Sequence, residues 1–343
     1  MSKAKPGVNR QWTLERRPMG DIRDGDLVFG HGTIPKAEPG QVVVRNEWLS
    51  LDPTNRIWMA DFHSYLPPVP LGAPMRGIVV GQVVDSGTDS LRPGQFVMGL
   101  GSWSDYSCEL ASNFSVVPEL PGISRKDVFG TYSYSGTTAY FGLLDIAAPR
   151  IGETLVVSGS AGAVGCLVGQ LGKAWGCKVV GIAGGADKCR WLTEELGFDA
   201  SIDYKSEDLD QRLREICPEG VDIFFDNVGG PTLNTLLGRL NLFGRVVQCG
   251  MISTYNAEMT SEGPSNYPLI LLHRLRVQGF LIFDSIARFP EAFRALRKLH
   301  LEGRLKWRYH EVEDLSLADP AVRLLYKGGN TGKMMVRVTD LSS

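Results

Sequence analysis

Short apolar runs separated by glycine, proline and aspartate characterise the first 130 residues of the chain. Residues 41–45, 77–84 and 95–99 have the composition of strands, and Leu91-Arg92-Pro93-Gly94 has that of a turn. This pattern predicts a small barrel or sandwich with many turns. The proline-rich stretch 61–74 lacks periodicity and predicts a long loop, of a kind that often carries function.

From about residue 130 onward, strand-like apolar runs alternate with helical patterns. The predicted strands are residues 154–157, 178–183, 201–204, 221–226 and 244–249, and the predicted helices are residues 163–176, 187–196, 209–217, 233–240 and 291–302. This alternation predicts a parallel, doubly wound sheet with helices on both faces. After residue 309 the pattern turns strand-like again, so we expect the tail to return to the first domain.

The sequence therefore predicts an α/β protein of two domains, one of residues 1–130 with 309–343 and one of residues 131–308. The length of 343 residues agrees with this number at about 150 residues per domain. With 36 Lys+Arg against 38 Asp+Glu, the net charge of −2 offers no attraction for nucleic acid or an anionic membrane.

Several classes of protein are disfavoured by what the sequence lacks. The polar N-terminus predicts no secretory signal, and residues 155–172 are too rich in glycine and polar side chains to predict a membrane span. The six cysteines form no C-x-x-C pair and the five histidines show no metal-ligand spacing, so we expect no metal site and a cytoplasmic location. A serine hydrolase is disfavoured because no G-x-S-x-G motif is present.

A glycine-rich turn follows the strand 154–157. In the segment from Ser160 to Gly165, Gly162 lets the backbone approach a pyrophosphate, and Gly165 lets the next helix pack closely on the strand. Ser160 replaces the first glycine of the usual fingerprint. Between a strand and a helix, this turn predicts dinucleotide binding at the helix N-terminus; a merely tight turn is the alternative.

The end of the second strand predicts which dinucleotide is bound. An NAD site has an acid about 20 residues downstream, whereas this strand ends in Gly184-Gly185, which leaves room for a 2′-phosphate. Lys178, Lys188 and Arg190 supply positive charge nearby; for Lys188 and Arg190 the alternative is a solvated helix face. We interpret Asp187 as a helix N-cap that faces away. The sequence thus favours NADP(H) over NAD.

Five segments together resemble a known family. They are Ser50-Leu51-Asp52-Pro53, Thr138-Ala139-Tyr140-Phe141-Gly142-Leu143-Leu144, Ala161-Gly162-Ala163-Val164-Gly165, Phe225-Asp226-Asn227-Val228-Gly229-Gly230 and Ser253-Thr254-Tyr255-Asn256. The chain resembles the zinc-independent medium-chain dehydrogenase/reductases over nearly its whole length, especially the NADPH-dependent alkenal/enone double-bond reductases. This resemblance implies a GroES-like β-barrel domain plus a Rossmann domain, and commonly a homodimer.

The resemblance also implies cofactor contacts. They are Ala163 and Val164 at the pyrophosphate, Lys178 and Tyr204 at the 2′-phosphate, Asn227 in the cleft, Cys249, Ser253 and Tyr255 beside the nicotinamide half, Phe280 and Phe283 lining the nicotinamide, and Asn330 from the tail. A surface lysine, a packed tyrosine and a turn asparagine are the alternatives for Lys178, Tyr204 and Asn330.

Two departures from the family pattern concern the substrate pocket. Thr54 stands where the family often has a tyrosine, and Phe283 stands where several members have the tyrosine proposed as proton donor. Phenylalanine cannot donate a proton. The candidate donors are therefore Tyr65, Tyr132, Tyr134 and His63, with water as the alternative. Asn55 is a candidate for a hydrogen bond to the substrate carbonyl, or else caps the backbone. The predicted pocket wall is Trp58, Tyr65, Tyr134, Tyr255 and Phe283.

The resulting prediction is a metal-free reductase that transfers a hydride from NADPH to the β-carbon of a hydrophobic α,β-unsaturated aldehyde or ketone. A zinc-free carbonyl or quinone reductase, or an alcohol dehydrogenase, is one alternative. A non-catalytic NADPH-binding protein is another. The sequence leaves open the natural substrate, the proton donor, the stereochemistry, the oligomeric state and the direction of the reaction in the cell.

Overall fold

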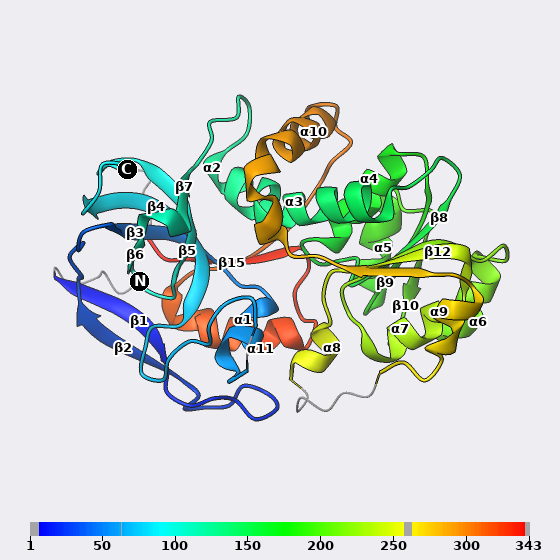
Figure 1. The fold of residues 1–343 in the computed structure, drawn as a ribbon, viewed down its shortest axis with the longest axis horizontal. Coiled ribbons are helices and arrows are strands. Elements are labelled where there is room, and N and C mark those ends of the chain that lie inside the picture. The colour runs from blue at the N-terminus through cyan, green and yellow to red at the C-terminus, as the bar shows by residue number, and fades with distance from the viewer. Residues whose placement is uncertain (1–6, 63, 257–262, 340–343) are drawn as a thin grey trace. The chain divides into compact units, whose positions relative to one another are not determined.

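The computed structural model describes residues 7–62, 64–256 and 263–339 (Figure 1). The chain forms two compact units. Unit 1 comprises Met1–Gly130, Tyr309–Asn330 and Met334–Ser343, and unit 2 comprises Thr131–Arg308 and Thr331–Lys333. Unit 1 is thus assembled from segments that lie on both sides of unit 2 in the sequence.

Unit 1 is built mainly from antiparallel strands. Its seven-stranded sheet has the order β14-β15-β3-β4-β5-β7, with β6 paired to β3, and β1 and β2 form a separate two-stranded sheet. The strands are β1 (Val8–Leu14), β2 (Leu27–Thr33), β3 (Gln41–Ser50), β4 (Arg76–Ser86), β5 (Phe96–Ser102), β6 (Tyr106–Leu110), β7 (Phe114–Val116), β14 (Tyr309–Val312) and β15 (Lys333–Arg337). A Cβ at Gly81 would lie 2.1 Å from the carbonyl oxygen of Arg45, so the close approach of β4 to β3 requires glycine there.

The three helices described in unit 1 are short, and the sequence pattern predicts none of them. They are α1 (Thr54–Met59), α2 (Arg125–Asp127) and α11 (Ala318–Tyr326), with 3-10 turns at Ala111–Asn113 and Leu315–Leu317. The prediction of a strand-like tail is wrong at α11, where Ala318, Ala321, Val322 and Leu325 are buried at helical spacing. The tail does contain strands on either side of α11, and β15 pairs antiparallel with β3.

Unit 2 contains a six-stranded sheet of order β10-β9-β8-β11-β12-β13. The strands are β8 (Thr154–Ser158), β9 (Lys178–Ala183), β10 (Ala200–Asp203), β11 (Val221–Asp226), β12 (Leu240–Gln248) and β13 (Arg276–Gly279), and neighbouring strands run parallel. The order reverses between β8 and β11, which is the topological switch point at which such sheets bind nucleotides. The predicted doubly wound parallel sheet is confirmed, and β13 is an edge strand that the sequence pattern misses.

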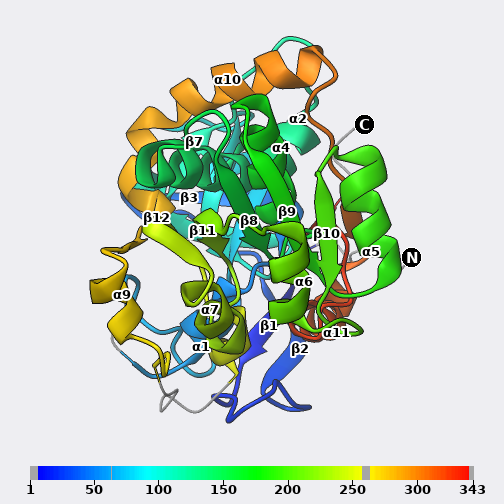
Figure 2. The ribbon, with the colours of Figure 1, turned by 90° about the vertical axis from the view of Figure 1, so that its right-hand side faces the viewer.

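Helices cover both faces of this sheet (Figure 2). They are α3 (Tyr134–Phe141), α4 (Gly165–Ala174), α5 (Ala186–Arg190), α6 (Leu209–Ile216), α7 (Gly230–Leu237), α8 (Ile252–Tyr255), α9 (Pro268–Leu272) and α10 (Phe289–Leu301), with π-helical turns at Val128–Tyr132, Gly142–Ala147 and Trp191–Glu195 and a 3-10 helix at Ile282–Arg288. One core packs Val156, Val180 and Ile202 of the sheet against Leu213 of α6 and Leu236 of α7. In the described part of the chain, no helix is both long and apolar enough to span a membrane.

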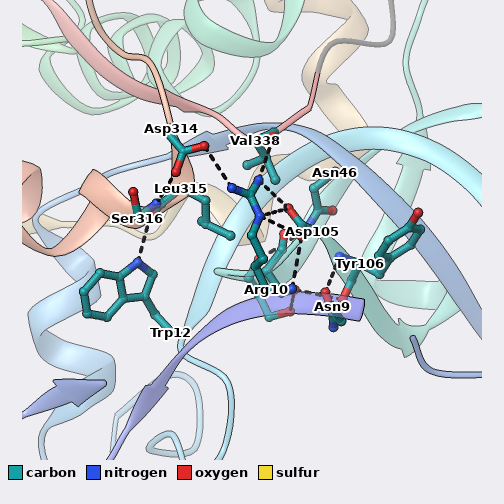
Figure 3. A network of polar contacts seen from close by, with 12 residues as sticks. Asn9, Arg10, Trp12, Asn46, Asp105, Tyr106, Asp314, Leu315, Ser316 and Val338 are labelled. Atoms are coloured by element: carbon teal, nitrogen blue, oxygen red, sulfur yellow. Dashed lines mark hydrogen bonds and ion pairs between the residues drawn. The ribbon is translucent and has the colours of Figure 1, made fainter. Parts of the chain in front are cut away.

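A buried guanidinium joins three distant segments of unit 1 (Figure 3). Arg10 on β1 donates from Nη2 to Asp105 Oδ1 at 2.9 Å and from Nε to Asp105 Oδ2 at 3.0 Å. Its Nη1 donates to Asp314 Oδ2 at 2.9 Å, and its Nη2 also donates to the carbonyl oxygen of Val338 at 3.4 Å. The Arg10 and Asp105 side chains are only 10% and 4% exposed. The hydrogen bonds to Asp105 raise the pKa of Arg10 despite its burial, so the guanidinium stays charged.

We expect Arg10→Met to lower the free energy of unfolding by about 3–5 kcal/mol, because it leaves the Asp105 carboxylate buried without its partner. Urea unfolding followed by tryptophan fluorescence measures this loss. The control Arg190→Met removes an exposed ion pair with Asp187 and should change the same quantity by less than about 1 kcal/mol. Adding Asp105→Leu to Arg10→Met should recover part of the loss. If the Arg10→Met and Arg190→Met proteins had equal free energies of unfolding, the stabilising role of the Arg10–Asp105 ion pair would be contradicted.

Candidate functional site

The turn between β8 and α4 has the geometry of a phosphate-binding loop. Gly159 adopts a φ of +57°, and the amide of Gly162 donates to the carbonyl oxygen of Gly159 at 2.9 Å. A Cβ at Gly165 would lie 2.5 Å from that same oxygen, so the first turn of α4 can approach the loop only with glycine there. Ala163 and Val164 are half-buried and lead into α4, where the helix N-terminus presents backbone N–H groups that suit an anion.

Ser160 holds this loop on the neighbouring strand. Its side chain is fully buried, and both its amide and its Oγ donate to the carbonyl oxygen of Ile182 on β9, at 3.1 Å and 2.9 Å. The residue that replaces the first glycine of the fingerprint therefore fixes the loop in place.

The crevice between β8 and β11 is lined by a connected polar group. Asp226 ends β11, is fully buried, and accepts hydrogen bonds from Ser158 Oγ at 2.8 Å and from the amides of Val228 and Gly229 at 2.9 Å and 3.0 Å. Burial raises the pKa of this carboxyl, while the two amides and Ser158 lower it. Asn227 donates from Nδ2 to the carbonyl oxygen of Ser158 at 2.7 Å, which fixes its side chain beside the start of the phosphate loop.

The loop after β12 is held by its own side chains. Ser253 donates to the carbonyl oxygen of Val228 at 2.6 Å, and the hydroxyl of Tyr255 accepts from the amide of Met251 at 3.1 Å. Burial, and then the nearby charge of Asp226, raise the pKa of the Cys249 thiol to about 12. Cys249 is therefore a thiol and not a nucleophilic thiolate at neutral pH.

The prediction that Lys178 binds the 2′-phosphate is wrong. Lys178 is the first residue of β9 and pairs with Thr154 at the start of β8, so it lies about 16 Å along the strand from Ala183 at the carboxyl edge. Its ammonium donates to the carbonyl oxygen of Ile216 at 2.5 Å. A nucleotide at the carboxyl edge is beyond its reach.

Lys188 and Lys205 lie at the carboxyl end of β9, where a 2′-phosphate would bind. A Cβ at Gly184 would lie 2.9 Å from Cε of Lys205 and 2.9 Å from Cε1 of Tyr204, so both side chains lie against the end of β9. Lys188 on α5 is half-buried, and burial together with the charge of Lys205 lowers its pKa. Two ammonium groups that repel one another favour a bound anion. Sequence reasoning noted Lys188 but missed Lys205, which follows the predicted Tyr204 directly.

The acids near this turn are already engaged. Asp203 accepts from the amides of Gly185 and Lys205 at 2.8 Å and 3.1 Å, and these bonds lower its pKa, that of Gly185 most. Asp187 pairs with Arg190 on the exposed face of α5, where Gly185 and not Asp187 is the N-cap. The N-cap prediction is therefore wrong, and Arg190 belongs to the solvated face that was its alternative.

Aromatic side chains gather beyond the carboxyl ends of β12 and β13. A Cβ at Gly142 would lie 2.7 Å from Phe280 and 2.8 Å from Phe225, so Phe280 is packed at the end of the sheet. The ring of Phe283 contacts that of Tyr134, with centroids 5.9 Å apart. Tyr132 is fully buried, and its hydroxyl lies 2.7 Å from His300 Nδ1, so this candidate donor is committed to the interior.

Of the predicted substrate residues of unit 1, two are half-buried and two are fully buried. Thr54 and Tyr65 are half-buried, and their hydroxyls form a hydrogen bond with one another. Asn55 is fully buried; its Oδ1 accepts from the amide of Asp52 at 2.8 Å, which is the backbone-capping role and not a contact with a carbonyl substrate. Trp58 is 1% exposed, so its prediction as a pocket wall is wrong, and it belongs to the core because it is on the inner side of α1.

The last predicted residues are Asn330 and His63. Asn330 belongs to unit 1 and is buried, at 8% exposure. His63 lies outside the described residues. Among residues 7–62, 64–256 and 263–339, no three His, Cys, Asp or Glu side chains gather as metal ligands.

Comparison with known proteins agrees with this geometry. A family described as the N-terminal domain of oxidoreductase matches residues 10–117, and one described as zinc-binding dehydrogenase matches residues 163–298. The chain is 39% identical to the NADPH-dependent curcumin reductase of Escherichia coli K12 over 340 residues, covering 96% of this chain and 97% of that protein. It is 36% identical to the NADP-dependent 2-alkenal reductase of Nicotiana tabacum over 341 residues, covering 96% and 98%.

A solved structure matches equally well. The crystal structure of CurA from Vibrio vulnificus in complex with NADPH superposes with a TM-score of 0.90 at 37% identity, covering 96% of this chain and 99% of that one. The chain belongs to the medium-chain dehydrogenase/reductase family. The resemblance to the alkenal/enone reductase branch, the GroES-like barrel plus Rossmann fold and the prediction of an oxidoreductase are confirmed.

For this medium-chain reductase we expect the double variant Lys188→Ala/Lys205→Ala to weaken NADPH binding about 100-fold or more while leaving NADH binding nearly unchanged. Each lost charge-assisted bond to the 2′-phosphate is worth about 1.5–3 kcal/mol, and a factor of ten in affinity corresponds to about 1.4 kcal/mol. Quenching of protein fluorescence gives both dissociation constants. Lys178→Ala and Arg190→Ala are the matched controls and should leave the ratio of the two constants as it is. A loss of NADPH affinity in Lys178→Ala alone would restore the original prediction.

Proposed function

We propose that this protein reduces the carbon–carbon double bond of hydrophobic α,β-unsaturated aldehydes and ketones, with NADPH as the electron donor and without a metal. The names of its relatives in Escherichia coli and tobacco support this reaction class. The observation that carries the proposal is the ring contact of Tyr134 with Phe283, with Phe280 packed at the end of the same sheet, together with two lysines at the carboxyl end of β9. Such a surface suits a conjugated, apolar substrate.

The residues of unit 2 fit the cofactor part by part. Residues 162–164 and the N-terminus of α4 would hold the pyrophosphate. Lys188, Tyr204 and Lys205 would hold the 2′-phosphate. Asn227, directly after β11, would contact the cofactor between β8 and β11. Bound NADPH supplies a hydride. The protein's part is to orient the two reactants and to stabilise the negative charge that develops on the substrate oxygen.

Product analysis tests this proposal directly. With NADPH deuterated at the transferred position, a 2-enal or an aryl enone should give the saturated carbonyl with one deuterium on the β-carbon. The zinc-free carbonyl reductase or alcohol dehydrogenase would give an allylic alcohol with deuterium on the carbonyl carbon. A quinone reductase would turn over quinones and leave the enones unchanged. Binding of NADPH with no product from any of these substrates would identify the non-catalytic alternative.

We also propose that the protein is a cytoplasmic homodimer whose two copies pair along β13. All four residues of β13 are exposed, and β13 ends the six-stranded sheet. Exposed apolar side chains surround it: Leu242, Phe243, Tyr267, Leu271, Leu272, Val277 and Leu281. An open, apolar edge strand favours pairing with a second copy related by a two-fold axis, because the copy satisfies the unpaired backbone groups and covers the side chains.

Size-exclusion chromatography with light scattering should give twice the mass of the chain, and Leu271→Asp/Val277→Asp should give the mass of one chain. The aspartates would place like charges on both sides of the two-fold axis. Leu301→Asp makes the same change at a side chain that is 57% exposed on α10, and this control should remain dimeric. If the β13 variant keeps the mass of two chains, the dimer is formed by another surface.

A further inference from the structure

Three tyrosines lie in or just before α3, and their hydroxyls have different surroundings. The hydroxyl of Tyr132 bonds to His300 at 2.7 Å, and that of Tyr140 donates to Glu291 Oε1 at 3.2 Å. Among the described residues, the hydroxyl of Tyr134 makes no such bond. This hydroxyl is therefore not committed to another described side chain and can donate to an acceptor on a ligand.

The surroundings of Tyr134 are aromatic. Its ring lies 5.9 Å from Phe283 at an interplanar angle of 58°, and 5.8 Å from Phe289 at 84°. Tyr134 is partly buried and keeps some exposed surface, so a ligand can contact it. Burial raises the pKa of Tyr134 to about 12, which keeps the phenol protonated and able to donate at neutral pH.

Tyr134 also packs against the segment that leaves the carboxyl edge of the sheet. Its neighbour Phe283 follows Gly279 by four residues, and Gly279 pairs with Gln248 at the carboxyl ends of β13 and β12. The loop that begins at Cys249 leaves the same edge, and the amide of Cys249 donates to the carbonyl oxygen of Asp226 at 2.9 Å. The phenol is therefore beside the carboxyl edge at which the nucleotide binds in this fold.

We propose that Tyr134 is a catalytic residue that donates a hydrogen bond to the carbonyl oxygen of the substrate and to the enolate oxygen that replaces it. This assignment rests on the proposed function and names the group that stabilises its charged intermediate. Of the two rings in contact, Phe283 has no hydroxyl, so Tyr134 is the one that can donate a hydrogen bond.

The reaction balances without a further reagent. The hydride forms a C–H bond at the β-carbon, the π pair of the C=C bond moves into the enolate, and the cofactor leaves oxidised. The α-carbon then takes a proton from solvent water, and the carbonyl re-forms. Tyr134 keeps its own proton throughout, because it donates a hydrogen bond and does not transfer the proton.

The test compares Tyr134→Phe with Tyr140→Phe, which removes a hydroxyl from the same helix. Removing a donor to a developing oxyanion lowers kcat about 100-fold or more, so we expect that loss in kcat of Tyr134→Phe on an aryl enone, with the NADPH dissociation constant unchanged. Tyr140→Phe should stay within about twofold of the parent protein, since its hydroxyl is bonded to Glu291. Adding Phe283→Tyr to Tyr134→Phe should recover at least tenfold, because a hydroxyl returns to the same aromatic pair.

A second readout does not need turnover. An aryl enone bound with NADP⁺ should absorb at longer wavelength than in buffer when a donor bonds its carbonyl, and Tyr134→Phe should lose that shift. Parental kcat and an unchanged shift in Tyr134→Phe would overturn the assignment. The shift in the parent protein, lost in Tyr134→Phe, but without any saturated product would leave Tyr134 as the donor and overturn the proposed reaction.

Discussion

The guanidinium of Arg10 is where the separated parts of unit 1 meet. It bonds to Asp105 between β5 and β6, and to Asp314 and Val338 more than 300 residues away in the sequence. A buried charge of this kind costs desolvation free energy unless every donor finds an acceptor, so it tolerates one arrangement of these segments and penalises others. The barrel is therefore completed only when the tail has returned, although the chain between the two parts forms a unit of its own. Trp12 adds a second tie, from Nε1 to the carbonyl oxygen of Leu315 at 2.7 Å.

In unit 2 the polar side chains near the carboxyl edge mostly form hydrogen bonds with backbone groups. Asp226 and Ser158 bond to one another and to turn amides, Ser253 and Tyr255 hold the loop after β12, and Ser160 holds the phosphate loop. These bonds rigidify the frame on which a nucleotide lies, and they leave the buried acid engaged instead of available as a base. A reaction at this edge thus depends on the cofactor for its electrons and on few side chains for the substrate. The proposed chemistry agrees with this division, because few polar side chains take part in it.

The sequence predicted the sheet well because its strands are short, continuous apolar runs between helices with clear spacing. β8, β9 and β11 lie where they were expected, within a residue. It failed where tertiary packing decides: α1 and α11 are short helices without strong caps, and β13 is four exposed residues that pair with one neighbour. The error at Lys178 has another origin. Its position at the start of a parallel strand already placed it away from the carboxyl edge, so the topology predicted from the same sequence argued against the resemblance-based assignment. Asn55 and Trp58 are buried because they lie on the inward face of α1, and no pattern in residues 54–59 predicted that helix.

The position of the donor relative to the hydride decides which bond of a conjugated carbonyl is reduced. A donor that bonds the oxygen while the hydride approaches the carbonyl carbon next to it favours an alcohol. When the donor instead holds the oxygen so that the β-carbon, two carbons further along, faces the hydride, the hydride adds to the β-carbon. The negative charge is then delocalised onto the oxygen that the donor bonds. A phenol that keeps its proton suits the second case, since it stabilises an enolate without converting it into an enol by full transfer. Phe283 is consistent with this logic, because replacing a tyrosine by phenylalanine beside Tyr134 removes a competing polar group and leaves one fixed point at which a planar enone is aligned on its aromatic surface.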